Sequence, residues 1–410
     1  MPEIAGISSA LDAQVAQGAT VGCVAVVVDA DGVLHESAHG TRAAGAPARM
    51  TADSVFRLFS MTKAIGTVAA LRLVDEGLLG LDDRVADILP EFGRLQVLDG
   101  WDGDAPRYRA PAGPVTVRHL MTHTSGLVYD IWNADQSRLI EVTGAPRMSH
   151  GRRASLPAFP LHFDPGARWE YGVSTDWLGL VVEEIAGERI EGFLKREILG
   201  PLGMSSTDVV FSPDMTARKV AVHSVGREGW RVLDADLPAT PDFFGMGHAL
   251  NGSGPDYARF LRMILRGGEL DGARILSAEA IRGLHDNAIG DLRMEPAASA
   301  KPEYGGGIEF FPGVEKTWTL AFMRNEQAIP GMRSAGSIGW AGVMNTHYWI
   351  DPTAGIAGVL MMQQLPFLDA GAVAAYAAFE RAVYAHLPAR GAAASPSPSP
   401  APAPTEAAPT

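Results

Sequence analysis

The pattern of hydrophobic and polar positions predicts strands towards both ends of the chain. Apolar residues fill Val21–Val28 and recur in Val33–His39, and the turn sequence Asp29-Ala-Asp-Gly32 between them is typical of a β-hairpin. From residue 304 onwards, short apolar segments alternate with turns, which predicts an antiparallel meander. The strands expected there are Gly307–Phe311, Thr317–Phe322, Ser334–Trp340, Val343–Ile350 and Gly355–Met362.

Helical spacing of apolar residues dominates the rest of the chain. The clearest case runs from Ile65 to Gly77, directly after the extended apolar segment that begins at Val55. Two shorter helices have recognisable caps, Thr116 before one and Ser174 before the other. Residues 91–114 are expected to be irregular and 128–162 to form a mobile entrance loop. The other expected helices are 3–17, 115–126, 176–186, 255–265, 277–284 and 369–387.

These elements predict an α+β fold with one central antiparallel sheet. The N-terminal hairpin and the C-terminal meander share that sheet, the terminal helices cover it, and a mostly helical insertion forms a second lobe. The expected boundaries are 1–85 together with 235–388 for the discontinuous α/β region, 86–234 for the helical lobe with its entrance loops, and 389–410 for a tail. The tail is Pro, Ala, Ser and Thr with almost no charge, so we expect it to be disordered.

Composition narrows the class of protein. The 410 residues are 47% hydrophobic and 20% charged, which is ordinary for a soluble enzyme, and the net charge of −13 argues against a nucleic-acid partner. No basic, apolar leader begins the chain and no apolar stretch reaches ~18 residues, so a cytoplasmic protein without a membrane span is expected. Cys23, the only cysteine, excludes an intrachain disulfide and is expected to be a buried small hydrophobe.

The candidate chemistry lies at Ser60 and Lys63. The chain has one Ser-x-x-Lys sequence, and it falls where the apolar extended segment becomes a helix. Residues three apart share a helix face, so the hydroxyl and the amine are within reach of each other. A serine needs a base to take its proton, and a lysine serves as that base when burial lowers its pKa. The alternative is that Ser60 is a helix cap and Lys63 a solvated residue, although a capping box has Glu or Gln at that third position.

His119 and His123 are spaced as two metal ligands on one helix face would be. No Glu completes a His-Glu-x-x-His sequence and no third ligand follows nearby. We therefore interpret both as structural, hydrogen-bonded histidines and expect neither a metal nor a cofactor.

Several motifs together resemble the serine β-lactamase and penicillin-binding superfamily. They are Ser60-x-x-Lys63, Tyr171-x-x and Trp340-Ala-Gly342, in that order, with His119–Leu127 and Pro165-Gly-x-x-Trp-x-Tyr171 in addition. The similarity extends over roughly residues 5–387. Among the superfamily, the sequence is most similar to the family VIII carboxylesterases, which have a class C β-lactamase-like, or transpeptidase-like, fold.

The resemblance implies a role for each matching residue. Ser60 is the implied nucleophile, Lys63 shares or tunes its proton, and Tyr171 is base or acid toward the hydroxyl, the leaving group and water. Trp340, Ala341 and Gly342 are implied to line the cleft on a strand. The backbone N–H groups of Ser60 and Val343 are implied to form the oxyanion hole. Whether Lys63 or Tyr171 is the base stays open, because a phenol needs a nearby cation to ionise and Lys63 is the natural candidate.

The departures from the superfamily's pattern bear on the substrate. β-Lactamases of this type usually have Lys-Thr-Gly where this chain has Trp340-Ala-Gly342, and Tyr-x-Asn where it has Tyr171-Gly-Val173. Both changes remove polar groups that hold an anionic, acylamino-bearing substrate, and Val173 becomes part of an apolar wall. Uncharged short- to medium-chain esters suit such a site. No Gly-x-Ser-x-Gly occurs, which disfavours an α/β-hydrolase.

Four hypotheses follow, with the esterase first. The others are a β-lactamase, D,D-peptidase or small-amide hydrolase, an acyltransferase that passes the acyl group to an alcohol, and a non-catalytic binding protein. The expected partner is a small ester, and the sequence does not indicate an oligomeric state.

Overall fold

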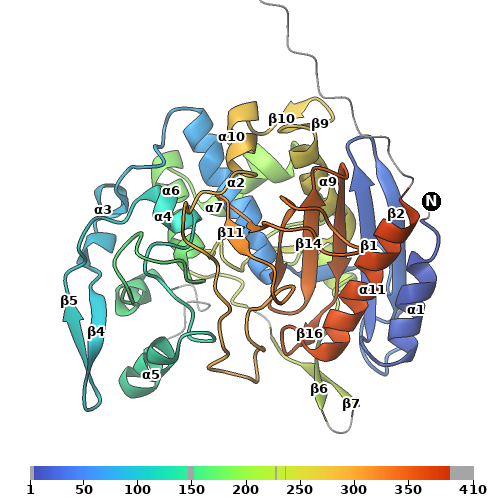
Figure 1. Ribbon diagram of the computed structural model, residues 1–410, viewed down its shortest axis with the longest axis horizontal. Coiled ribbons are helices and arrows are strands. Elements are labelled where there is room, and N and C mark those ends of the chain that lie inside the picture. Colours follow the sequence, from blue (N-terminus) through green and yellow to red (C-terminus); the bar gives the residue numbers. More distant parts are fainter. Residues whose placement is uncertain (1–3, 146–151, 227–228, 236, 388–410) are drawn as a thin grey trace, which may run out of the picture.

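A seven-stranded antiparallel sheet forms the centre of the computed structural model (Figure 1). The structure describes residues 4–145, 152–226, 229–235 and 237–387. The strand order is β11-β12-β13-β14-β15-β1-β2, so the N-terminal hairpin is added to the edge of the C-terminal meander as predicted. The bounds are β1 Gly22–Asp29, β2 Val33–Gly40, β11 Lys316–Trp318, β12 Met323–Asn325, β13 Ile338–Gly342, β14 Thr346–Asp351 and β15 Ile356–Met361.

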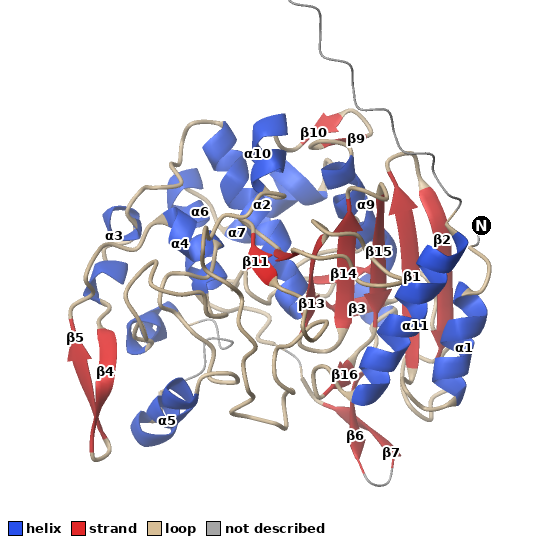
Figure 2. Cartoon of the chain, in the orientation of Figure 1, coloured by secondary structure: helices blue, strands red, loops and turns tan. Residues whose placement is uncertain are grey.

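Both faces of this sheet are covered (Figures 1 and 2). Strand β1 is buried along its whole length, and its side chains alternate between two hydrophobic clusters. Cys23 belongs to the cluster beneath the terminal helices α1 (Ile7–Ala16) and α11 (Ala370–His386), which pack on each other. Val24 belongs to the opposite cluster, under α9 (Gly254–Leu265). Burial raises the pKa of the Cys23 thiol to about 12, so the residue is the inert small hydrophobe that was expected.

The remaining helices gather on one side of the sheet. The central one is α2 (Thr62–Asp75), which is buried nearly all round and packs against α6 (Ser174–Ala186). A single hydrophobic cluster continues from the sheet through α2 into the helical lobe. The other helices are α3 Val85–Ile88, α4 Val117–Met121, α5 Ala134–Thr143, α7 Ile190–Leu194, α8 Pro213–Ala217 and α10 Ala278–Gly283.

Four small sheets complete the described elements. In the first, β3, which precedes α2 in sequence, pairs with β8. The second pairs β4 with β5 at the far end of the helical lobe, the third pairs β9 with β10, and the fourth adds β16 to the hairpin β6–β7. Their bounds are β3 Val55–Arg57, β4 Val97–Asp102, β5 Ala105–Arg109, β6 Val222–Gly226, β7 Gly229–Leu233, β8 Asn251–Ser253, β9 Glu269–Leu270, β10 Ala273–Arg274 and β16 Gln364–Leu365.

Several sequence-based expectations need correction. The segment expected to be irregular contains the hairpin β4–β5, which shows no alternation because β5 is largely exposed on both faces. Gly307–Phe311 forms no strand, and Ile308 makes an isolated bridge to Ala297. The meander's fourth expected strand begins later, at Thr346, since Val343, Met344 and Asn345 form the turn after β13.

Ser174 is not a helix cap. It is the first residue of α6, and its Oγ lies 2.9 Å from that of Ser125. Thr116, in contrast, caps α4 as expected, and His119 completes a capping box with it.

The predicted domain division stays a prediction, and two packing features bear on it. The helical lobe and the α/β region share one hydrophobic cluster, and β6–β7 lies with β16 beside the sheet although residues 220–233 fall within the expected lobe. The expected disordered tail, with Arg147 and His150 of the expected entrance loop, lies outside the described residues.

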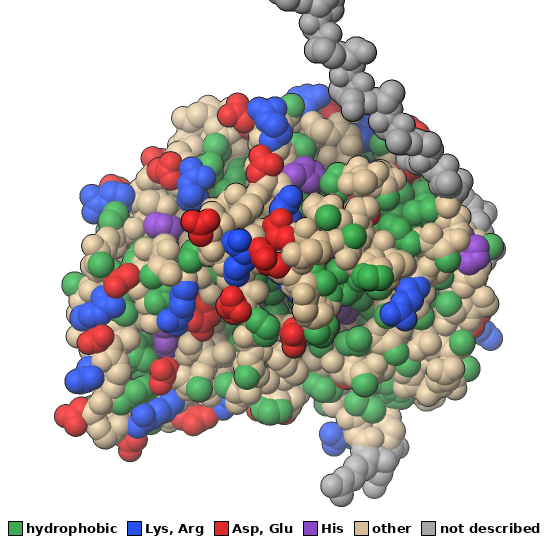
Figure 3. Space-filling view, viewed as in Figure 1, with side chains coloured by type: hydrophobic (Ala, Val, Ile, Leu, Met, Phe, Trp, Pro, Cys, Tyr) green, Lys and Arg blue, Asp and Glu red, His purple; other side chains and the backbone are tan. Residues whose placement is uncertain are grey.

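The molecular surface carries charges of both signs. On the face shown in Figure 3, acidic and basic side chains are interspersed over the helical lobe. Within the described part of the chain, no helix is both long and apolar enough to cross a bilayer. The cytoplasmic location stays a prediction.

The packing of Trp349 generates a stability prediction. A Cβ atom on Gly358 would lie 2.2 Å from the Trp349 ring, and that ring is fully buried and donates from Nε1 to Tyr384 Oη over 3.1 Å. We expect Gly358→Ala to lower the free energy of unfolding by about 1–3 kcal/mol, because overpacking a rigid core forces side chains apart. Urea unfolding measures this. Gly32→Ala is the control, since a Cβ there meets nothing within 4 Å. Equal urea midpoints for the two variants would contradict the prediction.

Candidate active site

Ser60 lies on a short 3₁₀ turn, Phe59–Met61, which leads directly into α2. Phe59, the residue before it, has φ of 44°, a conformation that costs a non-glycine residue free energy and persists only where the surroundings hold it. The surroundings do so here on both sides. The Leu58 N–H donates to Leu250 O over 2.9 Å, and Tyr257 Oη donates to Met61 O over 3.0 Å.

The end of β13 is pressed against the same turn. A Cβ on Gly342 would lie 2.4 Å from Leu58 O, so only glycine permits this approach. Trp340 and Ala341 precede it on the strand, 5% and 3% exposed, and the half-buried Val343 follows it in the turn. The strand predicted to line the cleft therefore adjoins the turn that carries Ser60. The oxyanion hole of Ser60 and Val343 N–H groups stays a prediction.

Lys63 is buried beside Ser60, with 2% of its surface exposed. Its Nζ lies 3.2 Å from Ser60 Oγ, 2.9 Å from Tyr129 Oη and 2.8 Å from Gly247 O. A neutral amine has two hydrogens and one lone pair. Tyr129 and Gly247 accept the two hydrogens, so the lone pair is left for the Ser60 hydroxyl. Burial lowers the pKa of Lys63 to about 7, against a smaller opposing effect of Asp176.

Tyr171 approaches Ser60 from the loop before α6. Its side chain is 3% exposed, hydrogen-bonds the Ser60 side chain and accepts a hydrogen bond from Trp340 Nε1 over 3.0 Å. Gly172 allows this loop to lie against the one that carries Tyr129, because a Cβ there would be 2.1 Å from Leu127 O. The segments that carry Ser60, Tyr129 and Tyr171, distant in sequence, thus meet around the Lys63 amine.

Lys63 was expected to stabilise a Tyr171 phenolate, but the two side chains share no hydrogen bond. Lys63 Nζ lies over the Tyr171 ring, 4.8 Å from its centroid, and donates to the hydroxyl of Tyr129 instead. Burial raises the pKa of the Tyr171 phenol well above its ordinary value, although hydrogen bonds from Ser60 and Trp340 oppose this. Tyr171 therefore keeps its proton at neutral pH.

Val173 and His123 are also buried beside this site, and the substrate-binding role of Val173 stays a prediction. Val173 is 2% exposed, so little of its side chain is accessible. His123 packs its ring on Tyr171 and Trp318, and burial holds its pKa well below the ordinary value. Its Nδ1 has no hydrogen-bond partner among the described residues, so the expectation of a hydrogen-bonded histidine fails for that atom. No group of three potential metal ligands occurs in the described ranges.

Sequence analysis missed three contributors to this site: Tyr129, Asp176 and the Gly247 carbonyl. Tyr129 lies two residues after the His119–Leu127 motif, and this proximity was a signal. Asp176 was recognised only as the first residue of a helix. A backbone carbonyl leaves no trace in residue identity.

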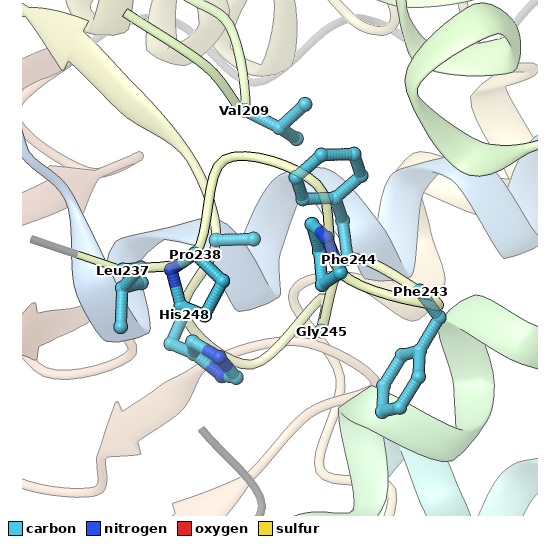
Figure 4. A pocket seen from close by; sticks show the side chains of 9 residues that line it. Val209, Leu237, Pro238, Phe243, Phe244, Gly245 and His248 are labelled. Atoms are coloured by element: carbon cyan, nitrogen blue, oxygen red, sulfur yellow. The ribbon is translucent and has the colours of Figure 1, made fainter. Parts of the chain in front are cut away.

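An apolar pocket lies next to the turn that carries Gly247 (Figure 4). Its lining includes Leu237, Pro238, Phe243, Phe244, Gly245 and His248. Gly245 and His248 lie on either side of Gly247, whose carbonyl binds Lys63, so the pocket adjoins the surroundings of Lys63.

The geometry agrees with the comparison to known proteins. The family described as Beta-lactamase matches residues 7–383, which is nearly the whole chain. The chain belongs to this family. The predicted β-lactamase/transpeptidase-like α+β fold is thereby confirmed. Membership of this family of serine hydrolases and acyltransferases also supports the prediction of a hydrolase-type enzyme.

Three relatives illustrate the family. Lovastatin esterase of Penicillium rubens is 29% identical over 88% of this chain and 94% of its own. Monacolin J acid methylbutanoyltransferase of Aspergillus terreus is 31% identical over 81% of this chain and 82% of its own. The unliganded structure of simvastatin synthase from Aspergillus terreus superposes with a TM-score of 0.80 at 26% identity, over 94% of this chain and 98% of that one.

The Lys63 environment predicts how Ser60 reactivity depends on pH. Only neutral Lys63 accepts a proton, so the rate at which a fluorophosphonate labels Ser60 should rise about tenfold per pH unit up to about pH 7 and then level off. Labelling rates between pH 5 and 9 test this, with circular dichroism confirming that the fold persists. A rate that is flat or falls over this range would refute Lys63 as the acceptor.

Proposed function

We propose that the protein is a serine carboxylesterase of the family VIII type, which hydrolyses short- to medium-chain esters through an acyl-enzyme on Ser60. The observation that carries the proposal is the buried Lys63 amine, which lies 3.2 Å from Ser60 Oγ and has Tyr129 Oη and Gly247 O as acceptors for two hydrogens. The similarity to a lovastatin esterase supports the same chemistry.

In the acylation step, Ser60 Oγ attacks the ester carbonyl while its proton passes to Lys63 Nζ. The backbone N–H groups of Ser60 and Val343 stabilise the resulting oxyanion, a contribution of about 3–4 kcal/mol for one such donor in other enzymes. Collapse of the intermediate breaks the bond to the alcohol, and Tyr171 Oη gives the leaving oxygen its proton. Lys63 then gives the proton that it took from Ser60 to the Tyr171 phenolate, which restores both groups.

Deacylation repeats these transfers with water as the nucleophile. Water attacks the acyl carbonyl and its proton passes to the Lys63–Tyr171 pair. Ser60 then leaves with a proton and the carboxylic acid is released. Burial keeps Tyr171 protonated, so it suits the role of acid, and Lys63 suits that of base.

The walls of the site suit an uncharged substrate. The rings of Tyr129, Trp132 and Trp340 each pack on that of Tyr171, and Lys63 lies over the rings of the two tyrosines. Trp340 stands where related β-lactamases carry a lysine. This arrangement offers apolar surface to an acyl chain and no cation at that position for a β-lactam carboxylate. Nitrocefin hydrolysis comparable to ester hydrolysis would favour the β-lactamase alternative.

An acyltransferase is the second candidate, and the 31% identity to a methylbutanoyltransferase specifically favours it. Both activities share the acyl-enzyme and differ in which nucleophile removes the acyl group. Adding an alcohol to the p-nitrophenyl ester assay and separating the new ester from the free acid distinguishes them.

We expect Ser60→Ala to abolish turnover of p-nitrophenyl acetate and to leave the melting temperature nearly unchanged, because the change removes only the nucleophile. Mass spectrometry of a digest should show an acylated Ser60 peptide in the wild type alone. Ser9→Ala, on an exposed position of α1, is the matched control. Near wild-type turnover in Ser60→Ala would exclude the mechanism.

We expect Tyr171→Phe to reduce kcat/KM by ~10²–10⁴-fold with little loss of stability, since the ring keeps its packing and only the proton donor is lost. Lys63→Ala should reduce it at least as far, and the two losses should not add, because both residues serve one proton-transfer step. Tyr108→Phe, 42% exposed on β5, is the control. Additive losses in the double variant would show that the residues act independently.

A further inference from the structure

Asp176 is a buried carboxylate that lies behind Lys63. It occupies the first turn of α6, five residues after Tyr171, and is 0% exposed. Its Oδ1 accepts the Gly247 N–H over 2.7 Å and lies 3.5 Å from His248 Nδ1. Its Oδ2 is buried without a hydrogen-bond partner among the described residues. Burying a charge with incomplete hydrogen bonding costs free energy, so the burial of this carboxylate calls for an explanation.

The turn of residues 245–248 is shaped around this carboxylate. A Cβ on Gly245 would lie 2.5 Å from Asp176 Oδ1, and one on Gly247 would lie 2.8 Å from it. Glycine at both positions allows the backbone to close on the oxygen. The same Gly247 presents its carbonyl to Lys63 Nζ at 2.8 Å. One peptide segment therefore links Asp176 to the lysine beside Ser60.

Asp176 also acts through its charge. Burial by itself would raise the pKa of its carboxyl, but His248, Lys63 and the Gly247 N–H together hold that pKa below the ordinary value, so the group is ionised at neutral pH. The other titratable groups that face Lys63 are the phenols of Tyr129 and Tyr171, which burial keeps protonated, and His123, which burial keeps neutral. Of these described groups, Asp176 is the one that supplies negative charge.

We propose that Asp176 is a positioning residue for the proton acceptor: it holds the Gly247 carbonyl against Lys63, and its charge sets the pH at which Lys63 becomes able to take the proton of Ser60. The inference rests on the proposed role of Lys63 toward Ser60. The proposed role explains why an acidic residue is buried at the start of α6. It also explains why Gly245 and Gly247 occupy the turn that closes on this residue.

The two effects predict different behaviour for two variants. Asp176→Asn removes the charge and keeps an oxygen that accepts the Gly247 N–H. Without the charge, Lys63 loses its proton more readily, so the midpoint of the pH–rate profile for Ser60 labelling should move down by ~1 unit or more. The plateau rate should fall less than about tenfold, because the Gly247 carbonyl stays in place. Asp176→Ala removes the charge and the acceptor, so it should show the same shift together with a plateau at least about tenfold lower than that of the Asn variant.

The experiment measures fluorophosphonate labelling of Ser60 against pH in the full chain. The matched control is Glu184→Gln, which removes one negative charge from an exposed position of the same helix and should leave the midpoint unchanged. An unchanged or higher midpoint in folded Asp176→Asn would overturn the inference. If that variant is insoluble, Asp176→Ser replaces it, because its smaller side chain also accepts an N–H bond and the same shift is expected.

Failure of this inference is distinguishable from failure of the proposed function. If wild-type Ser60 is labelled and esters are hydrolysed but the Asn variant keeps the wild-type midpoint, only the role of Asp176 is wrong. If Ser60 is labelled in a pH-dependent manner and no ester is hydrolysed, the esterase proposal is wrong while the effect of Asp176 on Lys63 is still measured.

Discussion

The exclusion of water from the Lys63 amine is the constraint on which the site depends. An ammonium group in water holds its proton far above neutral pH, and only desolvation at this position brings the pKa to about 7. Desolvation requires that the amine's hydrogens find partners within the protein, and Tyr129 and Gly247 provide them. The segments that carry these partners must therefore be in place before Lys63 can act as the proposed base, which ties that role to the tertiary fold rather than to the Ser-x-x-Lys sequence alone.

Close backbone approaches bring those segments together. Gly342 lets β13 touch the turn that holds Leu58, and Gly172 lets the Tyr171 loop lie on residue Leu127, just before Tyr129. These contacts bury the aromatic rings against one another. Phe59 is half-buried against a small cluster of Val222, Met344 and Leu365, while its neighbours Leu58 and Met61 belong to the large cluster shared by the sheet and the helical lobe, so packing on both sides holds its unusual conformation. A helical lobe that separated from the sheet would lose both the strain and the dry environment of Lys63.

Much of the fold is readable from sequence because its signals are local. The hairpin β1–β2 has its turn residues between two apolar runs, and α2 and α11 have clear helical spacing, so each was placed to within a few residues. Ser60 and Lys63 were found for the same reason, as they are one turn apart. The hairpin β4–β5 was missed because its second strand is exposed on both faces and has no period to detect. Asp176 and Gly247 were missed because their roles depend on contacts made across 71 positions of sequence, and one of the groups is a backbone carbonyl that any residue supplies.

The replacement of a lysine by Trp340 gives the division of roles between Lys63 and Tyr171 a physical basis. A second ammonium group next to the Tyr171 hydroxyl would stabilise a phenolate, and the superfamily's Lys-Thr-Gly pattern provides such a group. The indole Nε1 instead donates a single uncharged hydrogen bond to that oxygen, which stabilises a phenolate far less. With the phenol buried and no second cation at its oxygen, the Tyr171 proton stays in place, and we infer that Lys63 takes over as the acceptor. In the proposed mechanism, Trp340 thus accounts both for the lack of a cation that would bind an anionic substrate and for the choice of Lys63 rather than Tyr171 as the base.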